Sequence, residues 1–460
     1  MKAVLPALPK SDANGRFPAI EYTRVSLARS LIRERTALGL TQQQLAKLAG
    51  VREETLSRLG SREMFTRTSA TRHRRLTWGG RWRCCTAPMK VAVVSESFLP
   101  HVNGVTGSVL QVLKHLRTTG HEAQVMAPGS PPATCEGFEV VALPSVGLPG
   151  YQQVRVPLVV TSRIVRELER FGPDVIHLAS PFVLGGQVVR AAAALDIPVV
   201  AIYQTDVAGF ALRYGLTAAS STAWRRIRWI HERVQLTLAP SPTAAGNLED
   251  HGIPRVLVWP RGVDTAAFSP AHRDPGLQSQ QGSVRPVMVG FVGRLAAEKQ
   301  VEDLAVLADL PNVQLVVIGD GPERERLTRR LPGARFTGAL TGIDLSRAVA
   351  SLDVFVHPGP HETFCQAAQE AMASGVPVVA VGAGGLRDLV DSSRTGWLYP
   401  PGDLRALRAH VADLAGDGWK RRAMGAAAHE AVRARTWPVV CDRLLGHYEE
   451  AATGVKVGGS

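Results

Sequence analysis

Four short segments in the second half of the chain carry charged or glycine residues directly after apolar runs. Each run is rich in Val and Ile, as is typical of a buried strand. Arginine offers a planar fork to phosphate oxygens, lysine offers a point charge, and glycine lets the backbone approach an anion closely. At the ends of strands these residue types indicate a site for a phosphorylated ligand. The segments are residues 293–299 with Gly293, Arg294 and Lys299, residues 319–322, residues 357–364, and residues 382–385 with Gly384 and Gly385.

Two glutamates of the third segment, Glu362 and Glu370, are eight residues apart. On one helix that spacing corresponds to about 12 Å, at about 1.5 Å per residue. The paired carboxyl groups of a retaining glycoside hydrolase lie about 5 Å apart, so this pair is not spaced to flank one glycosidic bond. We therefore expect the two glutamates to serve opposite ends of a long ligand. A helix predicted over 365–373 would present its free amides to a diphosphate.

These segments need a scaffold, and the chain from residue 89 onward alternates short apolar runs with longer amphipathic ones. This rhythm is typical of a parallel α/β sheet. In the first half it predicts strands over 90–95, 122–127, 174–177, 198–203, 236–239 and 256–259, and helices over 108–117, 161–171 and 243–250. In the second half it predicts strands over 287–292, 314–318, 354–357 and 376–381, and a final helix over 439–450.

We predict two Rossmann-like, doubly wound domains that face a ligand cleft. The first covers residues 89–268, and the second covers 287–436 and carries the segments expected to bind an anionic nucleotide. Residues 269–286 are rich in Pro, Gly, Gln and Ser and are predicted to be a linker. The helix over 437–452 is expected to return towards the first domain.

A combination of motifs resembles one enzyme family, the retaining glycosyltransferases of the GT-B fold. Within it, the closest resemblance is to the bacterial GDP-mannose-dependent α-mannosyltransferases of glycolipid synthesis. The segments that carry the resemblance are the E-x7-E pair of Glu362 and Glu370, the loop 293–299, the segment 261–264 with Phe268, the Gly pair 384–385, and the segments 395–396 and 400–403.

The resemblance implies a role for each residue of the second domain that matches the family's motifs. Arg294 and Lys299 would bind the donor diphosphate, Glu370 the ribose hydroxyls, and Glu362 would lie beside the transferred sugar. It also implies that the leaving phosphate takes the acceptor proton and that the anomeric configuration is retained. The other donor-binding residues that we expect are Gly293, Thr363, Phe364, Cys365, Gly384 and Gly385.

Two segments of the first half complete the expected site. Asn103 and Gly104 match the family's glycine-rich loop, whose backbone would approach the donor phosphate and the acceptor. After the strand 198–203 many relatives have His followed by Thr-Asp, whereas this chain has Gln204, Thr205 and Asp206. We expect Gln204 to donate a hydrogen bond to the sugar and Asp206 to orient it, with an ordinary strand-end turn as the alternative.

A helix predicted over 221–238 carries Arg225, Arg226 and Trp229 away from its apolar stripe. Tryptophan among arginines is typical of a membrane interface, and a lipid-linked acceptor would require one. The alternative is a core helix with a basic rim whose aliphatic stems lie along the protein surface.

The net charge of +13 is concentrated near the N-terminus, because residues 1–88 carry a net +11. Within them, residues 25–60 resemble an incomplete helix-turn-helix of the phage-repressor type. Residues after 60 contain few apolar side chains that could complete its core, and we expect them to be disordered. We therefore do not expect DNA to be the partner.

Five cysteines without repeated spacing indicate reduced thiols, and the chain contains no D-x-D or H-E-x-x-H motif. We expect neither a metal nor another cofactor. No apolar run is as long as the roughly 18 residues that a membrane-spanning helix needs, and the first residues lack a signal-peptide pattern. The expected location is cytoplasmic, peripheral on the inner face of the cell membrane, in contact with anionic lipid.

The sequence thus predicts transfer of mannose from GDP-mannose to a membrane glycolipid, such as a glycosyl diacylglycerol or a phosphatidylinositol mannoside. Two alternatives remain open. One is a glycolipid transferase that uses a UDP-sugar, because the nucleotide base in this fold is recognised largely by backbone groups, which the sequence does not reveal. The other is a DNA-binding regulator that senses a nucleotide sugar.

Overall fold

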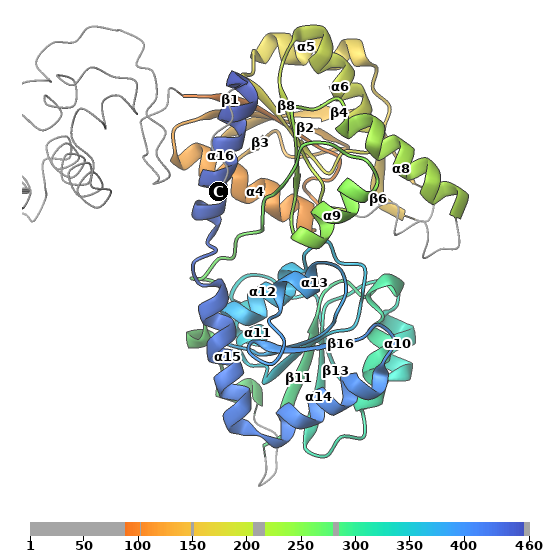
Figure 1. Ribbon diagram of the computed structural model, residues 1–460, viewed down its shortest axis with the longest axis vertical. Helices are drawn as coiled ribbons and strands as arrows, with labels where there is room; N and C mark the ends of the chain where they lie inside the picture. The colour runs from red at the N-terminus through yellow and green to blue at the C-terminus, as the bar shows by residue number, and fades with distance from the viewer. Residues whose placement is uncertain (1–87, 102, 149–150, 206–216, 279–284, 455–460) are drawn as a thin grey trace, which may run out of the picture. The chain divides into compact units, whose positions relative to one another are not determined.

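The computed structural model describes residues 88–101, 103–148, 151–205, 217–278 and 285–454. The expected helix-turn-helix segment, the expected disorder after it and Asp206 lie outside the described residues. Within these ranges the strands form two parallel sheets and one small hairpin (Figure 1).

The first sheet has the strand order β10-β9-β8-β7-β1-β2-β4-β3, and β3 alone runs antiparallel to its neighbour. Side chains alternate along β1, so that Val91 and Val93 pack on one face and Ala92 and Val94 on the other. Both faces are covered, which explains why the strand is a continuous apolar run. The strands are β1 (Lys90–Ser95), β2 (Glu122–Pro128), β3 (Thr134–Cys135), β4 (Phe138–Leu143), β7 (Val175–Ala179), β8 (Val199–Ile202), β9 (Leu236–Ala239) and β10 (Val256–Val258).

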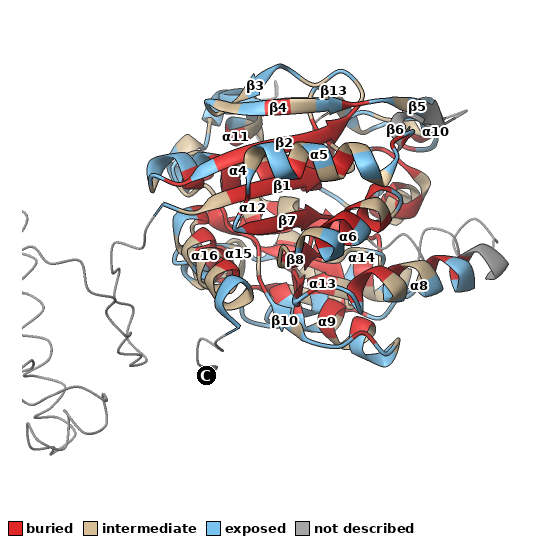
Figure 2. Cartoon of the chain, turned by 90° about the horizontal axis from the view of Figure 1, so that it is seen from above, coloured by how far each residue is buried: buried red, intermediate tan, exposed pale blue. Residues whose placement is uncertain are grey.

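Helices cover both faces of this sheet, and the buried residues form continuous layers between them (Figure 2). Residues of α4 and of the C-terminal α16 share one core cluster with β1, and residues of α5 and α6 share the other. The helices are α4 (Gly104–Thr118), α5 (Thr161–Phe171), α6 (Leu184–Leu195), α8 (Thr217–His231), α9 (Pro242–Asp250) and α16 (Trp437–Thr453), and the hairpin is β5 (Ser145–Leu148) with β6 (Tyr151–Pro157).

The second sheet is parallel throughout, with the order β13-β12-β11-β14-β15-β16. Its strands are β11 (Val287–Val292), β12 (Val313–Ile318), β13 (Arg335–Gly338), β14 (Val354–His357), β15 (Val378–Val381) and β16 (Gly396–Tyr399). Its α-helices are α10 (Arg324–Arg330), α11 (Gly342–Ala350), α12 (Gln366–Ala373), α13 (Gly384–Leu389), α14 (Leu404–Gly416) and α15 (Gly418–Val432). Short 3-10 turns lie at η2 (Pro270–His272), η3 (Pro275–Gln278), η4 (Ala297–Lys299) and η5 (Val301–Leu307).

The two sheets confirm the expected pair of Rossmann-like folds, but two helices differ from the sequence prediction. The helix expected over 221–238 ends at His231, and Leu236 is buried on β9 instead of lying on the outer face of α8. The β-branched and Leu-rich run after Val234 favours the sheet over the helix. In α12, Cys365 is the cap and not the first helical residue, so Glu362 lies before the helix.

None of the helices in the described ranges is long and apolar enough to span a bilayer.

Candidate active site

The first loop of the second sheet follows β11, and it places Arg294 and Lys299 at the carboxyl end of that strand. Gly293 has φ +151°, a conformation that L side chains rarely adopt. Arg294 makes an ion pair with Glu298, whose side chain is 4% exposed, while the Arg294 side chain is 46% exposed. The buried carboxylate therefore positions a guanidinium that remains accessible to a ligand.

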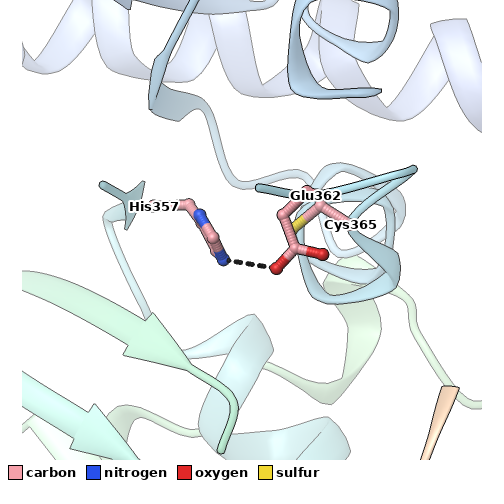
Figure 3. A group of neighbouring side chains, drawn as sticks. All are labelled: His357, Glu362 and Cys365. Carbon is pink, nitrogen blue, oxygen red and sulfur yellow. Dashed lines mark ion pairs between the residues drawn. The ribbon is translucent and has the colours of Figure 1, made fainter. Parts of the chain in front are cut away.

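Glu362 is the centre of the polar cluster after β14. One of its carboxylate oxygens, Oε1, accepts from the Lys299 ammonium and lies 3.1 Å from His357 Nε2. His357 is the last residue of β14, and Figure 3 shows its ring directed at the Glu362 carboxylate. The cluster thus joins the loops after two neighbouring strands, β11 and β14, as the topology requires.

Burial alone would raise the pKa of Glu362, but the nearby Lys299 ammonium and the bond with His357 outweigh it. The net effect holds the pKa of Glu362 well below its usual range. Burial likewise opposes the charge on Lys299, yet the Glu362 carboxylate raises the pKa of Lys299 above its ordinary value. Both groups are therefore charged at neutral pH, and each stabilises the other.

Cys365 extends the cluster, because its sulfur and the facing atoms of His357 and Glu362 lie within 4.8 Å of one another. Three such ligand types could hold a metal ion. However, Lys299 already places a cation on the Glu362 carboxylate, and burial raises the pKa of the Cys365 thiol far above neutral. The residues present thus fit an ammonium-paired carboxylate better than a metal centre.

Gly384 and Gly385 allow the loop after β15 to pack directly on the loop that carries Glu362. A Cβ atom on Gly384 would lie 2.3 Å from the Glu362 carbonyl oxygen, and one on Gly385 would lie 2.5 Å from Thr363 O and Phe364 Cα. The Gly385 amide donates to Glu362 O at 2.7 Å. The glycines were expected to approach a phosphate, and the structure gives them this additional role within the protein.

Glu370 lies on α12, the helix that begins directly after Cys365. Burial raises the pKa of Glu370 to about 7, partly offset by a hydrogen bond from Gln366. Gln366 and Gln369 on the same helix donate to the carbonyl oxygens of Gly262 and Arg261, at 3.0 and 3.1 Å. These bonds connect α12 to the segment that follows the first sheet.

Gln204 follows β8 and makes contacts in two directions. Its side-chain oxygen accepts from Arg261 Nη2 at 3.1 Å, and its backbone oxygen accepts from Thr363 Oγ1 at 3.0 Å. Its Nε2 is buried and has no hydrogen-bond partner among the described residues. A buried donor of this kind is available to a ligand.

Arg261 is a residue whose role the sequence did not indicate, although it lies in one of the family's motifs. Only 6% of it is exposed, and its guanidinium bridges Gln204 Oε1 and Gly104 O, the latter at 2.7 Å. Burial lowers the pKa of Arg261 to about 10, so it remains charged at neutral pH. His357 was likewise unassigned, although its position at a strand end was a usable signal.

Asn103 has a structural role at the start of α4. Asn103 Oδ1 caps α4 by accepting from Val105 N and Thr106 N, both at 3.0 Å.

The basic residues of α8 differ in their surroundings. The Arg226 guanidinium donates to the carbonyl oxygens of Phe182 and Val183. Trp229 is half-buried, and three guanidiniums lie within 5 Å of its ring; they belong to Arg190, Arg226 and Arg233. Arg225, in contrast, is exposed.

The structure therefore brings together Lys299, Glu362 and Cys365, with Arg294 on the same loop as Lys299. Thr363 connects this group to Gln204, and Arg261 connects Gln204 to Gly104. Among the expected membrane residues of α8, Arg226 lies over the Trp229 ring and Arg225 is exposed.

Comparison with known proteins identifies the family of this chain. The profile of Glycosyltransferase Family 4 matches residues 102–267, and that of the glycosyl transferases group 1 matches residues 286–417. The chain is 53% identical over 369 residues to the GDP-mannose-dependent alpha-mannosyltransferase of Mycolicibacterium smegmatis, which covers 78% of this chain and 97% of that protein. It is 30% identical over 390 residues to the phosphatidyl-myo-inositol mannosyltransferase of Mycobacterium leprae, covering 80% and 99%.

Among solved structures, sucrose-phosphate synthase from Thermosynechococcus elongatus superposes with a TM-score of 0.68 at 20% identity, covering 80% of this chain and 100% of that one. At this identity the likeness concerns the fold alone. Fold and sequence together define the class of this protein, a glycosyltransferase of the GT-B fold. Within that class, the chain belongs to the same family as the mannosyltransferase of M. smegmatis. The expected fold and family are thereby confirmed.

Proposed function

We propose that this enzyme transfers a mannosyl group from GDP-mannose to a hydroxyl group of a membrane glycolipid. The observation that carries the proposal is the 53% identity, over nearly the whole length of the relative, to a GDP-mannose-dependent alpha-mannosyltransferase. The weaker similarity to a phosphatidyl-myo-inositol mannosyltransferase supports a lipid-linked acceptor. Acceptors of this kind include glycosyl diacylglycerols and phosphatidylinositol mannosides.

In this proposal the donor lies along the carboxyl ends of the second sheet. Arg294 and Lys299 contact the diphosphate, because both are cations of the loop after β11. The Arg294 side chain is exposed and the Lys299 side chain is half-buried. Glu370 accepts hydrogen bonds from the ribose hydroxyls. Glu362 lies beside the mannose, where its carboxylate also holds Lys299 in place. Gln204 offers its buried Nε2 to a sugar hydroxyl.

During the reaction, the bond between the anomeric carbon and the β-phosphate oxygen breaks, and a bond from the acceptor oxygen to the same carbon forms. The acceptor proton passes to the departing phosphate, so GDP and a mannosylated lipid are the products. The configuration at the anomeric carbon is retained. Arg294 and Lys299 stabilise the negative charge that develops on the phosphate, a preorganised electrostatic contribution that requires no metal ligand.

The acceptor approaches through the first domain, near Gly104 and the helix that Asn103 caps. We assign the basic cluster of α8, with exposed Arg225 and with Arg226 and Trp229, to contact with anionic lipid. The enzyme then acts from the cytoplasmic side as a peripheral membrane protein.

The test of the donor is a set of thermal unfolding curves for the full chain with GDP, GDP-mannose, UDP and UDP-glucose. A ligand that binds only the folded state raises its stability, by about 2.7 kcal/mol at a concentration one hundred times Kd. Stabilisation by the guanine ligands alone supports the proposal, and stabilisation by the uridine ligands alone would replace it with a UDP-sugar transferase. Incubation with radiolabelled GDP-mannose and a membrane lipid extract then tests transfer.

A further inference from the structure

A strongly basic pocket lies at the amino ends of the strands of the second sheet, whereas the candidate active site lies at their carboxyl ends. It has a volume of about 470 Å³, and its lining includes Val287, Asp353 and Pro377 at the amino ends of β11, β14 and β15. The donor site follows the carboxyl ends of β11 and β14, so the two sites are separated by the length of the strands. Small-molecule sites commonly have volumes of about 300 to 1,000 Å³.

Four arginines line this pocket, namely Arg273, Arg285, Arg421 and Arg422. Asp353 is the one acidic residue among its described lining residues. The Asp353 carboxylate accepts from the Met288 amide at 2.9 Å and pairs with Arg273. It therefore compensates at most one of the four positive charges, and the pocket retains a substantial positive excess.

Two of the arginines have a structural explanation. Arg273 Nη1 donates to Leu352 O at 3.0 Å near the end of α11, and Arg421 Nη1 donates to Leu414 O at 2.7 Å near the end of α14. Cations are favourable at the carboxyl ends of helices, where carbonyl groups lack partners.

The other two arginines are not used in this way. Arg285 shares the Asp353 carboxylate with Arg273 through a longer ion pair of 3.4 Å, and the Arg422 guanidinium lies 4.7 Å from the centre of the exposed Trp419 ring. Both arginines are exposed. Burial lowers the pKa of Arg421, and Asp353 partly opposes this effect. The neighbouring Arg273, Arg422 and Arg285 lower the pKa further, because like charges repel one another. An anion in the pocket would relieve this repulsion.

We propose that this pocket binds a small anion that carries two or more phosphate groups. The geometry supports phosphate, because the planar forks of the arginines match phosphate oxygens. The proposal goes beyond the transfer reaction and uses none of the residues assigned to it. The same chemistry fits a soluble phosphate compound and the phosphorylated headgroup of a lipid, which the experiment separates.

The experiment is titration calorimetry of the full chain with inorganic pyrophosphate, with GDP held at the lowest concentration that saturates the donor site, because GDP in excess would itself compete for this pocket. The double substitution Arg285→Ala with Arg422→Ala removes the two arginines without a helix-end role. The matched control is Arg329→Ala with Arg330→Ala, two exposed residues at the end of α10 that give the same change in net charge. Arg422→Lys keeps the charge and loses the fork, and unfolding curves without pyrophosphate check that each variant folds.

We expect one pyrophosphate site in the wild-type protein and a loss of affinity of more than about tenfold in the Arg285/Arg422 variant, with no change in the control. Sedimentation with phosphatidylcholine vesicles, with and without phosphatidylinositol phosphate, separates the two sources. Vesicle binding that pyrophosphate displaces and that the Arg285/Arg422 variant loses assigns a lipid headgroup, and pyrophosphate binding alone assigns a soluble ligand. The proposal is overturned if the wild-type protein binds neither probe, or if the two double variants behave alike, whether both lose affinity or both keep it.

Discussion

The Glu362 carbonyl oxygen leaves no space for a side chain on Gly384, because a Cβ atom there would lie 2.3 Å away. Gly384 also has φ +54°, so a substitution meets backbone strain as well as a clash. The peptide that carries the Glu362 carboxylate is therefore fixed by the loop after β15. Its position relative to Lys299 depends on a residue that contributes no side chain.

We predict that Gly384→Ala and Gly385→Ala each reduce mannosyl transfer by at least about tenfold, because a misplacement of about 1 Å can cost about a hundredfold in rate. Initial rates with GDP-mannose would measure the effect. Gly446→Ala is the matched control, since Gly446 lies in α16 and a Cβ atom there would have no heavy atom within 4 Å outside the helix's own backbone. It should retain activity and gain up to about 1 kcal/mol in helix stability. Full activity in the Gly385 variant would contradict this explanation of the loop.

Removing one member of the Lys299 and Glu362 pair should affect both stability and activity. Lys299→Met leaves the largely buried Glu362 carboxylate without its ammonium partner, and breaking a buried ion pair in this way costs about 3 to 5 kcal/mol. Transfer should fall by about a hundredfold or more, because a phosphate ligand is also lost. Denaturant unfolding and kcat measure the two effects.

The variant Lys299→Arg separates the two effects, because it keeps a cation at the site. It should recover most of the stability but only part of the activity, since a guanidinium differs in shape from an ammonium. If Lys299→Met were as active as the wild-type enzyme, Lys299 would have no contact with the diphosphate. Circular dichroism would verify that each variant is folded.

GDP binding should depend on pH through Glu370, whose pKa burial raises to about 7. The ionised carboxylate has both oxygens available to accept from the ribose hydroxyls, so binding favours the ionised form. Affinity should therefore increase as the pH rises towards 7 and level off above it. Below pH 7 the dissociation constant should grow by up to about tenfold per unit, since one pKa unit corresponds to about 1.36 kcal/mol.

Glu370→Gln is the comparison for this pH dependence, since glutamine cannot ionise. Titration of the GDP phosphates affects both proteins equally, so the difference between the two pH profiles isolates Glu370. Parallel profiles would mean that the Glu370 carboxylate does not contact the ribose.

The sequence predicted the scaffold of the site well, because buried parallel strands are continuous apolar runs. The segments after β11 and β14 could be recognised as neighbours, since both follow strands and carry charged residues. The contact between Lys299 and Glu362, 63 residues apart, follows from the adjacent positions of these strands in the sheet. Short polar strands such as β13, in contrast, carry too few apolar residues to give a clear pattern.

Contacts that depend on tertiary folding could not be read from the sequence. Nothing in the local pattern around Arg261 distinguishes a surface arginine from one that is buried. Similarly, the amphipathic pattern of α8 continues past His231, although tertiary packing turns the following residues into β9. The role of Gly384 is of the same kind, because it depends on how closely the loop after β15 packs on the loop after β14.

Arg261 provides the last prediction, because it joins Gly104 O to Gln204 Oε1 through a single buried guanidinium. Arg261→Ala leaves the buried Gln204 Oε1 without this donor, and an unsatisfied buried group costs about 1 to 3 kcal/mol. We expect a loss of about 1 to 3 kcal/mol in the free energy of unfolding. Arg261→Lys should lose less, since an ammonium can reach one acceptor but lacks the fork that spans two. The exposed Arg394, paired with Asp391, supplies the control, and Arg394→Ala should change stability by less than about 1 kcal/mol. Equal stability of the Arg261→Ala and Arg394→Ala proteins in denaturant would show that the bridge is not required for the fold.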